Sequence, residues 1–85
     1  MLELGRTCAT ARVADELGAD LVLPLLERHE SGDWGVVCDE DKLANERALV
    51  EGARVLSAYV VNGSRVYVIT EQDRSSTTVL FAEEY

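Results

Sequence analysis

The pair Asn62-Gly63 stands between two stretches of β-branched and aromatic residues, and it constrains the fold more than any other part of the chain. A two-residue type I′ turn needs positive φ at both central positions, which Asn and Gly tolerate best. The turn therefore predicts an antiparallel hairpin over residues 54–70. Pairing outward from the turn places Val55 opposite Thr70.

A third strand is expected over residues 76–82, antiparallel to the second. Upstream, two to three helices are predicted to pack on this three-stranded sheet, which gives an α+β class. The helices are predicted from N-cap residues and terminating glycines. Their N-caps and spans are Thr10 with 11–17, Asp20 with 21–30, and Asp39 with 40–51. Residues 1–8 suit an extended start or a weak edge strand.

Neither face of the predicted hairpin is cleanly polar, so both need cover. One face is expected to pack on the helices. The other face, which carries Arg65 and Tyr67, is covered by the N-terminal segment or is left as a protein-binding surface.

The chain has 85 residues, room for a single domain, and a net charge of −8. Eight acids fall between Glu27 and Glu51, against three basic residues. A negative field opposes binding to nucleic-acid phosphates. Two interpretations stay open: the charge serves solubility, or an acidic face docks on a basic protein surface.

The two cysteines, Cys8 and Cys38, are too far apart for a redox or zinc pair, and His29 has no second ligand nearby. We therefore expect no metal and no cofactor, and two reduced, partly buried thiols, with a disulfide as the alternative. No apolar run is long enough to span a bilayer, and the N-terminus lacks the features of a signal peptide. These observations predict a cytoplasmic protein that does not bind membranes.

The polar loop before the third strand is the first candidate site. Glu71, Asp73, Arg74 and Ser76 supply carboxylates, an anion-binding arginine and a hydroxyl. The alternative is a solvated turn, in which Asp73 caps backbone N–H groups and Arg74 pairs with Glu71 or Asp73. No spacing matches a known catalytic or phosphate-binding motif.

Further binding candidates lie outside this loop. Trp34 is expected to fill a gap between helices and sheet, with ligand stacking as the alternative. Asn45, a poor helix former inside a predicted helix, is expected to make a polar contact. Asp41 and Tyr67 complete the set of hypothetical binding residues.

Several spaced motifs resemble a family of small "plasmid-related" proteins of bacterial plasmids and integrative elements. They are Gly32-Asp33-Trp34-Gly35, Asp41-Lys42, Asn45, Leu56-Ser57-Ala58-Tyr59, Ile69-Thr70-Glu71, Asp73-Arg74-Ser75, Thr77-Thr78 and Glu84-Tyr85. The chain departs from that pattern in its tight Asn62-Gly63 turn and in Tyr67, where tryptophan is common. The resemblance implies a mobile-element context, in which accessory proteins often antagonise restriction or CRISPR defence.

The sequence is therefore compatible with three functions. The first is a non-enzymatic factor that occludes the basic surface of a protein partner, with a nucleic-acid-binding defence protein as the specific expectation. The second is a small ribonuclease or toxin-like enzyme that uses Glu71, Arg74 and Arg54. The third is a regulator or antitoxin that forms a homodimer across the second face of the hairpin.

Overall fold

The hairpin around Asn62-Gly63 forms as predicted. The computed structural model describes residues 2–85, and within it Asn62 and Gly63 have φ values of 51° and 79°. The turn joins strand β2 (Val55–Val61) to strand β3 (Ser64–Thr70). Their register pairs Val55 with Thr70 and Val61 with Ser64, so the predicted pairing is confirmed.

The α+β class is confirmed, but the sheet has four strands rather than three. Strand β4 (Ser76–Phe81) pairs antiparallel with β3, and the N-terminal strand β1 (Arg6–Ala9) pairs parallel with β4. The strand order is β1-β4-β3-β2. The parallel strand arises because the chain crosses over the sheet through helices before it returns as β2.

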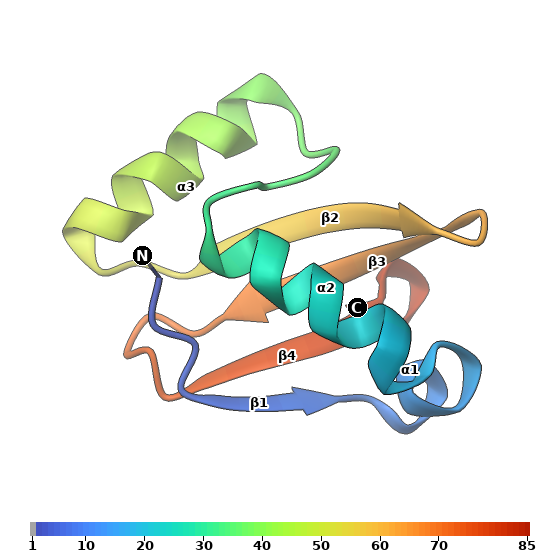
Figure 1. The fold of residues 1–85 in the computed structure, drawn as a ribbon. Coiled ribbons are helices and arrows are strands. Elements are labelled where there is room, and N and C mark those ends of the chain that lie inside the picture. Colours follow the sequence, from blue (N-terminus) through green and yellow to red (C-terminus); the bar gives the residue numbers. More distant parts are fainter. Residues whose placement is uncertain (1) are drawn as a thin grey trace.

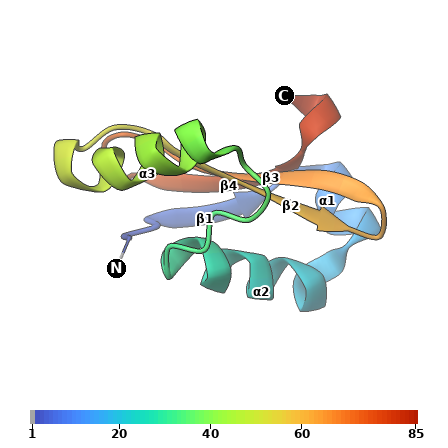
Figure 2. The ribbon, with the colours of Figure 1, turned by 90° about the horizontal axis from the view of Figure 1, so that it is seen from above.

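Helices α1 (Ala11–Glu16) and α2 (Gly18–Glu30) follow β1, and a short 3₁₀ helix η1 (Ala82–Glu84) ends the chain. Figure 2 shows α2 on one side of the sheet and the C-terminus on the other. The covered face holds the main core, which α1 and α2 share with the sheet. Its buried residues are Val13, Val22, Leu25, Leu26, Tyr59, Val66, Val68, Val79 and Phe81.

Helix α2 differs from the prediction at its start. It begins at Gly18, after Leu17 as N-cap, so Asp20 lies in the first turn and does not cap the helix. Pro24 is consequently inside the helix. Thr10 does cap α1 as predicted, since its Oγ1 accepts from the N–H of Val13.

Helix α3 (Asp39–Glu51) lies beyond the β2 edge rather than over a face of the sheet (Figure 1). Its N-cap is Cys38, so the prediction of Asp39 as cap was wrong by one residue, and Gly52 ends it with a left-handed φ of 74°. Cys38 and Cys8 are both free and exposed, which corrects the expectation of partly buried thiols.

The loop before α3 pairs with the edge of β2. Ala58 donates to the carbonyl of Trp34 and accepts from the N–H of Val36. Gly35 between them has φ of 74°, and a Cβ there would lie 1.9 Å from the carbonyl oxygen of Ala58. Only glycine therefore lets this loop approach the strand so closely.

A buried chain of hydrogen bonds joins α2 to the middle of the sheet. Nδ1 of His29 lies 2.5 Å from Oγ of Ser57, and Nε2 lies 2.9 Å from Oγ1 of Thr70. Thr70 is 2.7 Å from Oγ1 of Thr77, which donates to the carbonyl of Leu4 at 2.7 Å. The four side chains are completely buried.

The donor and the acceptor of each hydrogen bond in this row can be assigned from its last acceptor, the carbonyl of Leu4. The carbonyl of Leu4 only accepts, so Thr77 gives its single proton there and must accept from Thr70. Thr70 then accepts from Nε2–H of His29, and the neutral imidazole accepts from Ser57 at Nδ1. This row of hydrogen bonds therefore requires a neutral His29 with its proton on Nε2. Burial, together with the nearby charge of Arg74, lowers the pKa of His29 to about 4.

We predict that the free energy of unfolding falls as the pH drops from 6.5 to 4. In this range the unfolded chain binds a proton at His29, whose ordinary pKa is 6.5, while the folded chain does not. The contribution is complete above pH 6.5 and amounts to about 3 kcal/mol at most. Urea unfolding of the wild type and His29→Gln across this range measures it. The variant is expected to lose this part of the slope, and equal slopes would contradict the assignment.

Candidate functional site

The polar loop between β3 and β4 is an ordered turn. Oδ1 of Asp73 accepts from the N–H of Ser75 at 3.0 Å, and the N–H of Glu71 donates to the carbonyl of Ser76. The pKa of Asp73 is lowered by its hydrogen bonds from the side chain and the backbone of Ser75. Asp73 therefore caps backbone N–H groups, as the solvated-turn interpretation expected.

Arg74 binds main-chain carbonyls rather than a carboxylate. Its Nη1 donates to the carbonyls of Ala53 at 2.6 Å and Glu71 at 3.2 Å, and its Nη2 donates to that of Ala48 at 3.0 Å. Ala48 lies in the last turn of α3, where a cation is favourable, and Ala53 follows the C-cap Gly52. The guanidinium thus ties the loop to α3, and the predicted pairing with Glu71 or Asp73 through carboxylates is wrong.

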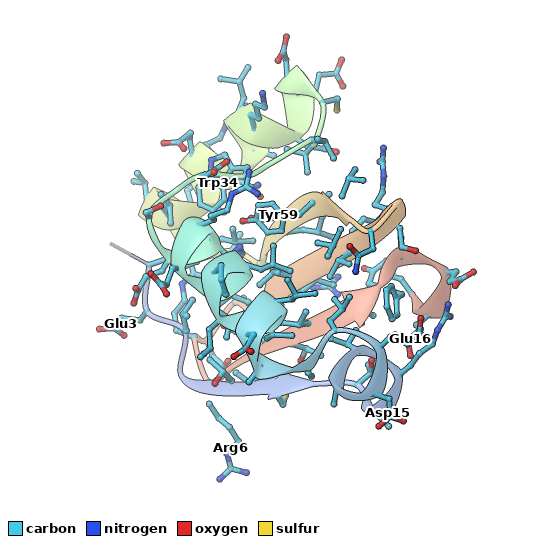
Figure 3. All side chains as sticks on the ribbon, turned by 45° about the vertical axis from the view of Figure 1, so that its right-hand side comes forward. Glu3, Arg6, Asp15, Glu16, Trp34 and Tyr59 are labelled. Carbon is cyan, nitrogen blue, oxygen red and sulfur yellow. The ribbon has the colours of Figure 1, made fainter. Side chains whose placement is uncertain are left out.

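Trp34 and Asn45 are both buried and both bind neighbouring elements. The indole N–H of Trp34 donates to Oε2 of Glu46 at 2.7 Å, and its ring meets that of His29 edge-on. Figure 3 shows Trp34 close to Tyr59, inside the molecule. The core position predicted for Trp34 is therefore confirmed.

Asn45 pairs with the outer edge of β2 as another strand would. Its Nδ2 donates to the carbonyl of Leu56 at 2.8 Å, and its Oδ1 accepts from the N–H of Leu56 at 3.2 Å. Since only Asn45 and Ala48 of α3 are buried, this amide provides much of the specific attachment of α3 to the sheet. The polar contact expected of Asn45 is confirmed.

The remaining predicted residues gather around Arg54. A hollow of about 220 Å³ lies between α3 and β2, and its lining includes Asp41, Asn45 and Arg54. Arg54 lies 3.8 Å from the carboxylate of Glu71 and donates to the hydroxyl of Tyr85 at 2.7 Å. We call this the α3–β2 hollow.

Tyr85, which Arg54 contacts, lies on the face of the sheet opposite α2. Its ring meets that of Tyr67 edge-on at 5.8 Å between centroids. Arg54 and Tyr85 thus connect Asp41 and Asn45, which line the hollow, with Glu71 and Tyr67. Trp34 lies in the core, and Asp73, Arg74 and Ser76 are used in the turn and the sheet.

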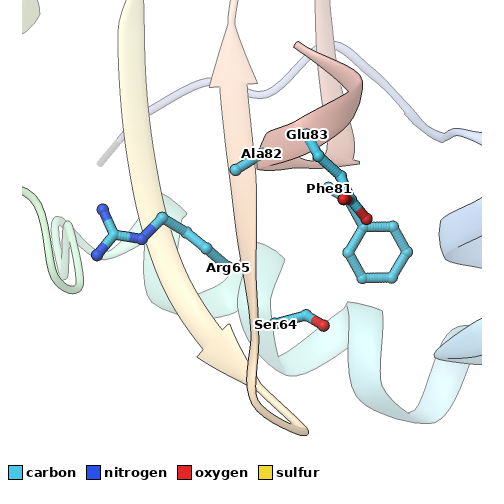
Figure 4. Close-up of a pocket in the computed structure, with 5 residues that line it drawn as sticks. All are labelled: Ser64, Arg65, Phe81, Ala82 and Glu83. Atoms are coloured by element: carbon cyan, nitrogen blue, oxygen red, sulfur yellow. The ribbon is translucent and has the colours of Figure 1, made fainter.

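A second hollow, of about 210 Å³, lies where the hairpin passes η1 (Figure 4). Ser64, Arg65, Phe81, Ala82 and Glu83 line it. Arg65 and the ring of Phe81 point away from each other in this view, so their groups do not converge on a ligand. We assign no site here.

Sequence reasoning missed the pairing of Ser57 with His29. A serine bonded to a histidine nitrogen is the geometry of an activated nucleophile. Here both side chains are fully buried, and the second nitrogen binds Thr70 rather than a carboxylate. The pair therefore holds α2 on the sheet. The alternation of Ser57 with apolar neighbours in β2 was the available signal, but 28 residues separate it from His29.

Two ionisable groups beside Trp34 also have shifted pKa values. The hydrogen bond from Arg28 lowers the pKa of Asp33, while burial raises the pKa of Tyr59 to about 12. Tyr59 donates to the carbonyl of Asp33 at 2.6 Å, and the guanidinium of Arg28 lies over its ring. These contacts fix the loop that follows α2.

Comparisons with protein-family profiles, with curated proteins and with solved structures return no match to this chain. Among residues 2–85, no His, Cys, Asp and Glu side chains cluster as a metal site would require. None of the helices in that range has the length and apolar character needed to cross a membrane.

We predict that Asn45→Ala lowers the free energy of unfolding by about 1–2 kcal/mol, because two hydrogen bonds to the β2 edge are lost. Leu43→Ala on the same helix is the control, since Leu43 is exposed. Chemical denaturation measures both, and equal effects would show that Asn45 does not hold α3.

We predict that Arg74→Met lowers the free energy of unfolding by about 2 kcal/mol, because three carbonyls lose a charged donor. Arg47→Met is the matched control, since Arg47 is exposed on α3 and makes no ion pair within residues 2–85. Its effect should stay within about 0.5 kcal/mol. An Arg74 variant as stable as the wild type would argue against the structural role.

Proposed function

We propose that this protein is a non-enzymatic binding factor that docks on a basic protein surface through the outer face of α3. The observation that carries the proposal is the composition of that face. Leu43 and Val50 lie seven residues apart, on the same side of the helix, and are 62% and 87% exposed. Exposed apolar side chains with a polar rim are typical of an interaction surface. The exposed charges of α3 are five acids against two basic residues, of which Arg47 lies on the same side as Leu43 and Val50.

The way α3 is attached supports this function. Apolar packing normally holds a helix on its sheet, through a stripe of buried side chains. Here Asn45 and Arg74 hold α3 by hydrogen bonds instead, and Ala48 is its only buried apolar residue. The apolar residues of α3 are therefore free to contact another molecule.

Charge supports a basic partner. Asp39, Glu40 and Glu51 are exposed on α3, and none of them forms an ion pair within residues 2–85. Acids around an apolar centre increase the rate of association with a basic surface and make it depend on salt. The partner class we propose is a nucleic-acid-binding defence protein of a bacterial host, in line with the resemblance of the sequence to proteins of mobile elements.

The test compares two triple variants of equal charge. Asp39→Asn/Glu40→Gln/Glu51→Gln neutralises α3, and Asp15→Asn/Asp20→Asn/Glu27→Gln neutralises exposed acids of α1 and α2. Each changes the net charge from −8 to −5, since three acids are removed. Phage plating on bacteria with restriction or CRISPR defence, with and without the protein, measures activity. Affinity purification with mass spectrometry identifies the partner.

We expect the wild type and the α1–α2 variant to protect phage and to retain the partner, and the α3 variant to lose both. Val50→Ser should weaken binding without lowering stability, because Val50 is almost fully exposed. A wild type that neither protects phage nor recovers a defence protein would refute the partner class. Equal loss in both triple variants would refute the α3 face.

A further inference from the structure

Strand β1 leaves one edge of the sheet open. The N–H of Arg6 donates to the carbonyl of Ser75, and the N–H of Thr10 donates to the carbonyl of Val79. The backbone N–H and C=O groups of the even-numbered residues of this strand therefore point towards β4. The N–H and C=O groups of Thr7 and Ala9 therefore point outward. Within residues 2–85 no backbone group pairs with them. Figure 1 shows no other element beyond β1 at this edge.

An apolar groove runs along the open edge. It encloses about 170 Å³ between β1 and α2. It is lined by Thr7, Cys8 and Ala9 on the strand and by Ala19, Val22, Leu23 and Leu26 on the helix. Leu23 is 56% exposed. An edge strand beside an apolar helix face is the arrangement to which an additional strand binds.

We infer that this edge binds the β1 strand of a second copy of the chain, antiparallel, with the two-fold axis at Cys8. In this register Thr7 lies opposite Ala9 of the partner subunit, and Ala9 lies opposite the partner's Thr7. Each pair exchanges two hydrogen bonds. All outward groups of both strands are then satisfied. A register centred on Thr7 would need Gly5 to extend the strand, which its φ of 63° prevents.

The ends of the strand are complementary in charge in this register. Arg6 forms no ion pair within residues 2–85, and Figure 3 shows its side chain pointing away from the molecule. The register places Arg6 opposite the partner's Thr10. In this chain Thr10 donates to the carboxylate of Glu84 at 2.9 Å, so each arginine meets an acid of the other copy. The two copies of α2 also flank the junction, where they cover Leu23.

The two Cys8 residues form the central pair. A pair without hydrogen bonds in antiparallel strands has Cα atoms about 4.5 Å apart, which is within the range that a disulfide spans. Formation of a disulfide between the two Cys8 residues would therefore indicate this register. Diamide accepts the two protons and two electrons that the two thiols lose when their sulfur atoms bond.

The experiment combines sedimentation equilibrium with crosslinking of the full chain. The wild type is expected to sediment as a dimer, and Cys38→Ser is expected to crosslink with diamide under native conditions, whereas Cys8→Ser is not. Thr7→Pro removes an outward N–H from each copy and should weaken the dimer by about tenfold or more. Val60→Pro is the matched control, because Val60 occupies an outward position on the opposite edge and is 58% exposed.

Circular dichroism must show that both proline variants are folded. If Thr7→Pro unfolds, Arg6→Glu replaces it, and it should also weaken the dimer. A wild type that stays monomeric at its highest soluble concentration would overturn the inference and leave the edge to a foreign strand. A dimer without the Cys8 crosslink, or one weakened only by Val60→Pro, would place the interface elsewhere.

Discussion

The buried imidazole of His29 is the interaction on which the rest of the structure depends. It joins α2 to β2 and β3 directly, and through Thr70 and Thr77 it reaches β4 and the N-terminal segment at Leu4. Five parts of the chain thus share one row of polar atoms in an otherwise apolar core. Such a row is specific because a hydroxyl has one proton, so each bond fixes the direction of the next. Any slip of α2 along the sheet would leave buried groups unpaired.

The two edges of the sheet differ in how far their outward backbone groups are paired. At the β2 edge, Asn45 pairs with Leu56, and Trp34 and Val36 pair with Ala58. Of the outward positions on this strand, only Val60, next to the turn, has no backbone partner within residues 2–85. At the β1 edge, the outward backbone groups of Thr7 and Ala9 have no backbone partner within residues 2–85. Proteins commonly protect exposed edges, because open edges recruit other strands. The fuller protection of the β2 edge is consistent with a role for the β1 edge.

The parts that the sequence predicted well are those that local chemistry determines. The Asn62-Gly63 turn fixed the register of β2 and β3, and Gly52 ended α3, because each depends on backbone conformation within a few residues. The position of α3 was not predictable in the same way. Its attachment uses Asn45 and the distant Arg74, and no apolar periodicity reveals a helix held by such contacts. The same holds for Ser57 and His29, and for the gathering of Asp41, Glu71 and Tyr67 around Arg54.

The two proposed surfaces are compatible because they lie on opposite edges of the sheet. Joining β1 strands would give one continuous eight-stranded sheet, and the strand order β1-β4-β3-β2 then places the two copies of α3 at its far ends. The two acidic faces would thus point away from the two-fold axis and remain accessible. A dimer of this form could contact two sites on one partner or two copies of it, and the second contact would form at a high effective concentration. A weak α3 face would then suffice for stable binding, which fits a helix whose exposed apolar residues are few.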